Sequence, residues 1–152
     1  MTRGGFELVL DAVLPKARAC GRFADVRRDA AMLECSAKGS AAPAHYRLEV
    51  DSGGLWASLV MADRWLSHSI EADLLNTGDK AEELLEEELV ELGHHGGAPR
   101  VEHFRSEDKL FTFRSLIEVD SARADAAEVA LRFLLAFEAC FRRLGDMDAG
   151  SE

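Results

Sequence analysis

Five histidines offer the side chains best suited to metal binding or acid–base chemistry, and two of them are adjacent. His94 and His95 open the sequence His-His-Gly-Gly, and His103 follows in the next segment. Imidazole binds transition metals and exchanges protons near neutral pH. Neighbouring residues in a glycine-rich segment are poorly placed to converge on one ion, and the chain has no His-Glu-x-x-His or Cys-x-x-Cys motif. We therefore expect no metal ligands and no cofactor. A small metal-dependent or hydrolytic enzyme that uses His94, His95 or His103 is the alternative hypothesis.

The strongest potential nucleophiles are three cysteines, Cys20, Cys35 and Cys140. Their odd number and wide spacing are typical of reduced thiols in a cytoplasm. A catalytic thiol needs a neighbouring base or cation, whereas Cys140 lies among apolar residues. The chain also contains no Gly-x-Ser-x-Gly elbow and no glycine-rich phosphate loop. The sequence therefore predicts no catalytic residue.

Acidic residues dominate the charge, with 28 Asp and Glu against 18 Lys and Arg, a net charge of −10. This charge repels phosphate backbones and anionic lipids, so we expect neither a nucleic acid nor a membrane as partner. A protein partner is easier to accommodate. No apolar run approaches the roughly 18 residues of a membrane span, and the N-terminus does not resemble a signal peptide. We expect a soluble, cytoplasmic protein.

The segments that must position these side chains begin with a helix and continue as strands. Apolar residues between Phe6 and Leu14 recur at helical spacing, and Pro15 either kinks or ends that helix. Residues 16–29 have no clean period and are left unassigned, and a short apolar run over 30–35 could form a strand. An antiparallel meander is predicted from alternating or apolar segments at 45–50, 55–61 and 64–71, with a hairpin turn at 51–54.

The second half of the chain predicts a helix, a hairpin and a last helix. The period becomes helical over 77–92, with Glu82, Glu83, Glu86, Glu87 and Glu91 on a solvated face. The hairpin comprises 100–105 and 110–119, and the last helix covers 122–144. The order helix, three strands, helix, two strands, helix predicts an α+β fold with an antiparallel sheet. One domain should cover residues 1–145, followed by a disordered tail at 146–152.

The last helix is apolar over more than one stripe. Val129, Phe133 and Phe137 suffice to cover one sheet face, yet further apolar residues lie beside them. Either the helix is buried on two sides within the monomer, or part of it contacts another chain. The second alternative predicts a homodimer. Its contact residues would be Ala127, Leu131, Leu134 and Leu135.

The chain resembles the type III secretion chaperone-like fold over residues 44–144. This fold is shared by the CesT/Tir effector chaperones and by the YbjN-like putative bacterial sensory transduction regulators. The matching residues are Asp73-Leu74-Leu75-Asn76, Leu110-Phe111-Thr112-Phe113, and Phe133, Phe137 and Phe141 of the last helix. The resemblance implies a small acidic homodimer that binds protein segments without enzymatic turnover. We therefore expect a non-enzymatic, chaperone-like or adaptor domain that binds a protein partner.

Overall fold

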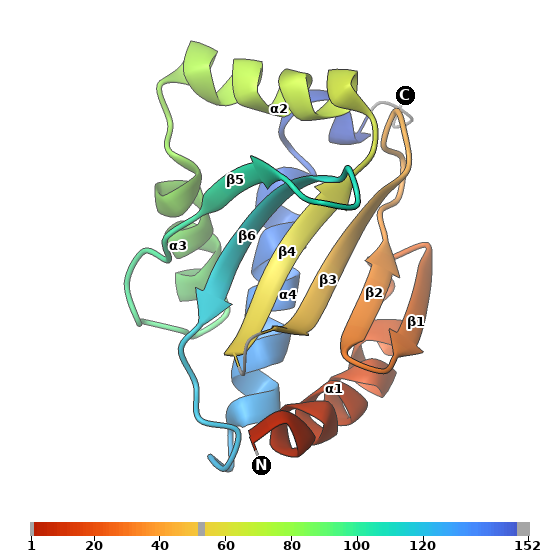
Figure 1. The fold of residues 1–152 in the computed structure, drawn as a ribbon. Coiled ribbons are helices and arrows are strands. Elements are labelled where there is room, and N and C mark those ends of the chain that lie inside the picture. The colour runs from red at the N-terminus through yellow and green to blue at the C-terminus, as the bar shows by residue number, and fades with distance from the viewer. Residues whose placement is uncertain (1, 52–53, 149–152) are drawn as a thin grey trace.

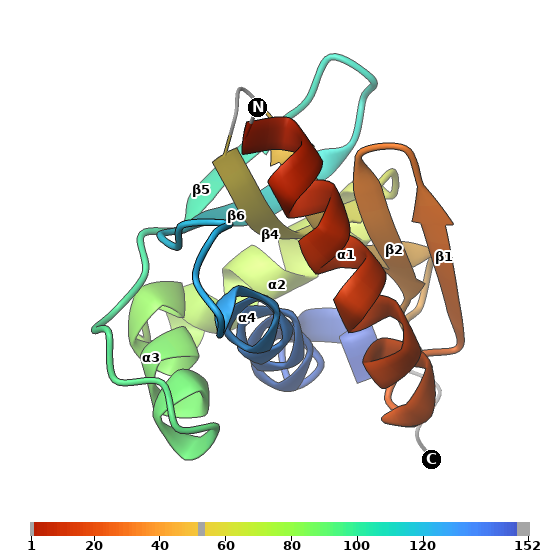
Figure 2. The same ribbon diagram turned by 90° about the horizontal axis from the view of Figure 1, so that it is seen from below.

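A six-stranded antiparallel sheet with helices packed on one face forms the protein (Figures 1 and 2). The structure is a computed structural model that describes residues 2–51 and 54–148. The strand order is β1-β2-β3-β4-β6-β5. The elements in chain order are α1 (Thr2–Ala19), β1 (Asp25–Asp29), β2 (Met32–Ser36), β3 (Ala44–Asp51), β4 (Gly54–Met61), α2 (Arg64–Thr77), α3 (Ala81–Glu91), β5 (Glu102–Arg105), β6 (Phe111–Ile117), α4 (Ala126–Phe141) and the 3-10 helix η1 (Gly145–Asp148).

The predicted α+β class is confirmed, and so are two of its hairpins. Strand β3 alternates strictly, with Tyr46, Leu48 and Val50 buried between half-exposed residues. It pairs with β4 from Ala44 opposite Met61 onward. The second hairpin joins β5 and β6. It attaches to the first four strands through the pairing of β6 with β4. Helices α2 and α3 lie between those two strands in the chain.

The strand predicted at 64–71 is wrong, because this segment begins helix α2. The Asp63 carboxylate caps the helix by accepting a hydrogen bond from the Leu66 amide at 2.8 Å. Leu66, Ser67 and Ile70 are the buried residues, a spacing that only a helix places on one face. The spacing of Leu66 and Ile70 fits the two-residue period of a strand as well as the 3.6-residue period of a helix. The cap and the tertiary packing decide between the two.

The N-terminal region is more regular than the sequence indicates. Helix α1 continues through Pro15 to Ala19, so Pro15 does not end it. The unassigned residues 16–29 complete this helix and then form the edge strand β1, whose residues Asp25 to Asp29 pair with Ser36 to Met32. Only Val26 of β1 is buried, which explains the lack of a clean hydrophobic period.

The tail is partly ordered. Residues 146–148 belong to η1, whereas a disordered tail was expected from residue 146. The Gly145 amide donates to the Asp73 carboxylate, the Asp146 amide donates to the Ser69 hydroxyl, both at 2.9 Å, and Met147 is buried. These contacts fasten η1 to helix α2. The remaining predicted tail residues, 149–152, lie outside the described residues.

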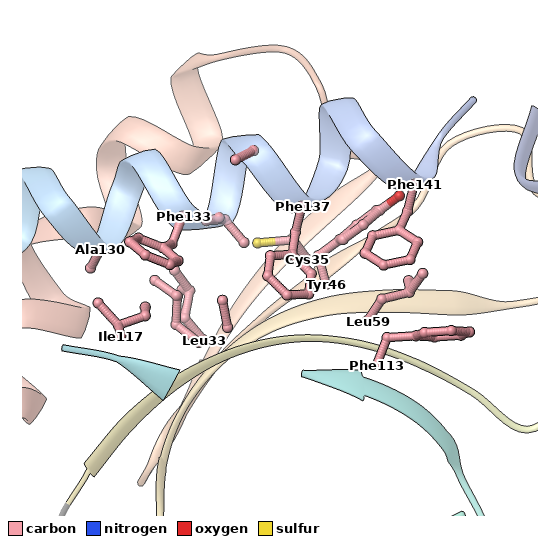
Figure 3. Close-up of a cluster of buried hydrophobic side chains, with 14 of the residues drawn as sticks. Leu33, Cys35, Tyr46, Leu59, Phe113, Ile117, Ala130, Phe133, Phe137 and Phe141 are labelled. Atoms are coloured by element: carbon pink, nitrogen blue, oxygen red, sulfur yellow. The ribbon is translucent and has the colours of Figure 1, made fainter. Parts of the chain in front are cut away.

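Helix α4 is the centre of the core and packs against the sheet, α1 and α3 within one chain (Figures 2 and 3). Its aromatic residues Phe133, Phe137 and Phe141 project toward the sheet side chains, including Leu59 and Phe113 (Figure 3). Neighbours on three sides explain the surplus apolar width of this helix, because each neighbour buries a different stripe. The alternative of burial within the monomer accounts for it without a second copy.

Of the four residues expected at a dimer contact, one is fully buried in the chain's own core and three are only partly buried. Leu134 has no exposed surface, so it cannot contact a second copy. The other three, Ala127, Leu131 and Leu135, are partly buried and pack against the core cluster. The homodimer itself stays a prediction, and Leu134 is not part of its contact. Among the described residues, no helix is long and apolar enough to cross a membrane.

Candidate functional site

The sheet face opposite the helices is open, and a continuous row of polar side chains crosses it. Strand register aligns Arg27, Glu34, Arg47, Ser58, Arg114 and Glu102, one from each strand. Opposite charges alternate within the row: Glu34 lies 3.0 Å from Arg27 and 2.8 Å from Arg47. Directly opposed charges of opposite sign stabilise strand pairing. This row therefore holds the sheet together on its solvated face and leaves few charges free there.

Trp56 interrupts this polar face near the β6 side. The guanidinium carbon of Arg114 lies 3.9 Å from the centre of the Trp56 ring, and Leu116 is its cross-strand neighbour. Arg114 also donates from Nε to the Glu102 carboxylate at 3.0 Å. Leu116 remains 42% exposed. An aromatic ring fixed by a cation, next to an exposed leucine, makes a rigid apolar surface for a ligand.

Beside this surface, the edge strand β5 is shorter than its neighbour β6. Strand β5 has four residues and pairs only with 111–114 of β6, although β6 continues to Ile117. Ser115, Leu116 and Ile117 thus have a strand partner on the β4 side alone. The segment between α3 and β5 turns away from the sheet next to this end of β6 (Figure 1). Unpaired backbone groups at a sheet edge are a template for another strand.

A cleft of about 670 Å³ lies at this free edge. Its walls come from both faces of the sheet: Trp56 and Leu116 belong to the open face, whereas Phe133 of α4 lies on the helical side. We call it the edge cleft. Its lining residues are Trp56, His94, Gly96, Gly97, Ala98, Pro99, Arg100, Glu102, Leu116, Glu118, Arg123 and Phe133.

The third wall of the edge cleft is the glycine-rich segment 94–100. Gly97 adopts a φ of +91°, which residues with a side chain rarely adopt. Within the described residues, the backbone amides of 95–98 and of Arg100 donate no hydrogen bond to another group of the chain. The next amide, that of Val101, donates to the Glu82 carboxylate at 3.1 Å. The wall is thus anchored at its end and offers free amides along its length.

His94 contributes an uncharged wall to the edge cleft. Its ring packs edge-on against Phe133, with centroids 5.2 Å apart. Burial lowers the pKa of His94, and the nearby Arg132 and His95 lower it further. The imidazole is therefore neutral at neutral pH, which suits an apolar contact.

The three histidines of the alternative hypothesis are not brought together as a metal site. His94 lines the edge cleft, His95 is exposed, and His103 lines a second hollow between α2 and α3. Among residues 2–51 and 54–148, no three His, Cys, Asp or Glu side chains form a group that could hold a metal ion. The arrangement gives the metal hypothesis no ligand set.

His103 has a structural partner on each ring nitrogen. Nδ1 lies 3.0 Å from the Thr112 carbonyl and Nε2 lies 2.8 Å from the Glu71 carboxylate, while the ring stacks on Phe113 at 3.8 Å. Which ring nitrogen donates depends on the tautomer. The two contacts and the stacking on Phe113 hold the ring between β6 and α2.

The cysteines show no sign of activation. Burial raises the pKa of Cys35 and of Cys140 to about 12, so neither forms a thiolate at neutral pH. The Cys20 thiol is exposed and donates to the Ala17 carbonyl at 3.1 Å. All three thiols are free.

The sequence named His94 only as part of the alternative enzyme hypothesis, and it did not predict the edge cleft. The cleft depends on where β5 begins and on the pairing of β4 with β6, neither of which a local pattern specifies. The one available signal was the sequence Gly96-Gly97-Ala98-Pro99 ahead of the hairpin, which disfavours an early start of β5.

Comparison with models of known protein families, with curated proteins and with solved structures finds no match to this chain. The resemblance to the type III secretion chaperone-like fold therefore stays a prediction. The interpretation of the edge cleft rests on its own geometry and chemistry.

Proposed function

We propose that this chain is a non-enzymatic protein-binding domain of the cytoplasm, chaperone-like or adaptor in role, that holds an extended segment of a partner in the edge cleft. One observation carries the proposal: β5 leaves Ser115 to Ile117 of β6 without a strand partner on the side away from β4, next to a cleft lined from both faces of the sheet. The free reduced thiols support the cytoplasmic location.

An extended segment fits this site because a strand displays its side chains to alternate faces. A guest residue opposite Leu116 would share the open face with Leu116 and Trp56. A guest residue opposite Ile117 would point to the helical face, where Phe133 and His94 line the cleft. Main-chain hydrogen bonds to the edge would supply affinity, and the two apolar contacts would supply selectivity.

The edge is short, which favours reversible binding over uncontrolled association. Only three residues of β6 extend beyond β5, and the Ile117 carbonyl already accepts the Val119 amide at 3.0 Å. Long flat edges lead to aggregation, whereas short edges limit it. A guest can therefore pair over about three residues and must gain the rest of its affinity from its side chains.

The test selects peptides from a random heptapeptide library flanked on both ends by Gly-Ser spacers and measures their binding by calorimetry. Hydrogen exchange should then show new protection at those amides of residues 115–117 that point away from β4. Leu116→Asp should weaken binding at least about tenfold, because it places a charge against the guest. Leu8→Asp is the matched control, since Leu8 is 70% exposed on α1. This variant should bind the selected peptides with the same affinity as the wild type.

Two results would overturn the proposal. One is the absence of any binder to the intact chain, both from this library and from the same heptapeptides displayed with free C-termini. The other is a set of binders whose affinity is equally unaffected by Leu116→Asp and by Leu8→Asp, since the guest would then lie elsewhere.

A further inference from the structure

The antiparallel sheet determines the direction of a guest strand in the edge cleft. All five strand pairs are antiparallel, including β5 with β6. A guest that continues this pattern lies in line with β5 and runs in the same direction. It would face Ile117 first, then Leu116, then Ser115. Its C-terminal end therefore arrives where β5 begins.

The chain itself blocks that end. The position after Ser115 is taken, because Arg114 already pairs with Glu102 of β5. The hydrogen bond from the Val101 amide to Glu82 holds the start of β5 against helix α3. An antiparallel guest thus has to turn away at this point or terminate.

The blocked end carries an unused positive charge and unused amides. Arg100 is exposed and has no ion pair with a described residue, and the amides of Gly96 and Gly97 donate no hydrogen bond to any part of the chain that the structure describes. Glu102, an acidic residue that also lines the cleft, is held by Arg114 at 3.0 Å. The opposite end of the cleft instead carries the exposed carboxylate of Glu118.

We infer that the guest is the free C-terminus of a partner protein, whose terminal carboxylate pairs with Arg100 and accepts hydrogen bonds from the Gly96 and Gly97 amides. A terminal carboxylate ends the strand where the chain blocks it, and charge-assisted bonds to a guanidinium and to backbone amides are among the strongest polar contacts. Glu118 favours a positive charge a few residues upstream. This inference rests on the proposed function and specifies the class of partner for the same cleft.

The test displays the random heptapeptides a second time with free C-termini, in parallel with the library that carries spacers on both ends. Selected sequences are then synthesised as free acids and as C-terminal amides, and both forms are titrated into the intact chain. We expect the acids to bind at least about tenfold more tightly, the size of one charge-assisted contact. Arg100→Gln should reduce this acid preference to below about threefold while leaving the affinity of the amides unchanged.

Arg123→Gln tests the direction of the guest. Arg123 lines the other end of the edge cleft, already 2.9 Å from Asp125, so the acid preference should survive this change. A guest running parallel to β6 would lose its acid preference in Arg123→Gln and keep it in Arg100→Gln, which overturns the inference. Binders that bind equally as acids and amides also overturn it but leave the proposed function intact, whereas two libraries without binders overturn both.

Discussion

Arg114 of β6 stacks on Trp56 of β4, with its guanidinium carbon 3.9 Å from the ring centre, and so fixes one wall of the edge cleft. The same guanidinium binds Glu102 of β5, and its contact with Phe104 at 5.0 Å adds a second aromatic face. Arg114 also lies 3.5 Å from the Asp51 carboxylate of β3, so one side chain connects β6 with β3, β4 and β5. It uses its planar face for the ring and its edge for the carboxylate, a combination that lysine lacks.

Arg114→Ala should lower the free energy of unfolding by about 1–2 kcal/mol, because it removes two cation–π contacts and two partly exposed ion pairs. Arg114→Lys should recover only part of that loss. Urea unfolding followed by tryptophan fluorescence measures both, in a Trp65→Phe background because Trp65 is 76% exposed and adds its own signal. Equal stability of the Lys variant and the wild type would contradict a role for the planar guanidinium.

The cap of helix α2 predicts a second stability effect. Asp63→Ala should cost about 1 kcal/mol, since the Leu66 amide loses its acceptor, whereas Asp63→Asn should cost much less because the amide oxygen still accepts. Asp79→Ala, an exposed acid after the same helix, serves as the control and should change stability by under about 0.5 kcal/mol. Equal effects at the two positions would show that α2 does not depend on this cap.

Glu138 predicts a pH dependence of stability. It is 6% exposed on α4, with Arg142 and Arg22 at 3.4 and 3.6 Å, and burial raises its pKa although both arginines oppose the shift. The folded state then binds the proton more tightly than the unfolded state. Stability from this group is present below the ordinary glutamate pKa of about 4.3 and is lost as pH rises through the raised value.

Glu138→Gln should remove the loss of stability that accompanies ionisation of Glu138 as the pH rises. The free energy of unfolding of the variant, relative to wild type, should therefore be higher at pH 7.5 than at pH 4. Urea unfolding at both values measures the difference, with Glu87→Gln on the exposed face of α3 as the control. A relative stability that falls with pH would mean that the arginine pairs outweigh burial.

A substitution in helix α4 can distinguish an effect on folding from an effect on association. Leu134→Ala should cost about 2–5 kcal/mol, because the side chain is fully buried within one chain, while Leu75→Ala at an 83% exposed site should change little. Light scattering tests the proposed homodimer, which requires a mass near twice 16.7 kDa. Leu134→Ala should leave that mass unchanged. A stable monomer produced by this change at no cost in folding would place Leu134 at a subunit contact.

Local patterns were sufficient for elements whose burial alternates with a single period. Tyr46, Leu48 and Val50 mark β3, and Leu85 and Leu89 mark the buried side of α3, because each side chain reports one neighbouring surface. The same patterns determined the α+β class.

Tertiary contacts decided what those patterns left open. Leu66 and Ile70 fit a strand or a helix, and the Asp63 cap with burial against the sheet selects the helix. The width of α4 fitted a dimer or a crowded core, and packing by α1, α3 and the sheet fills it within one chain. The edge cleft exists because β4 pairs with β6 across two intervening helices, and such long-range pairing depends on the whole chain's burial, which no segment of it encodes.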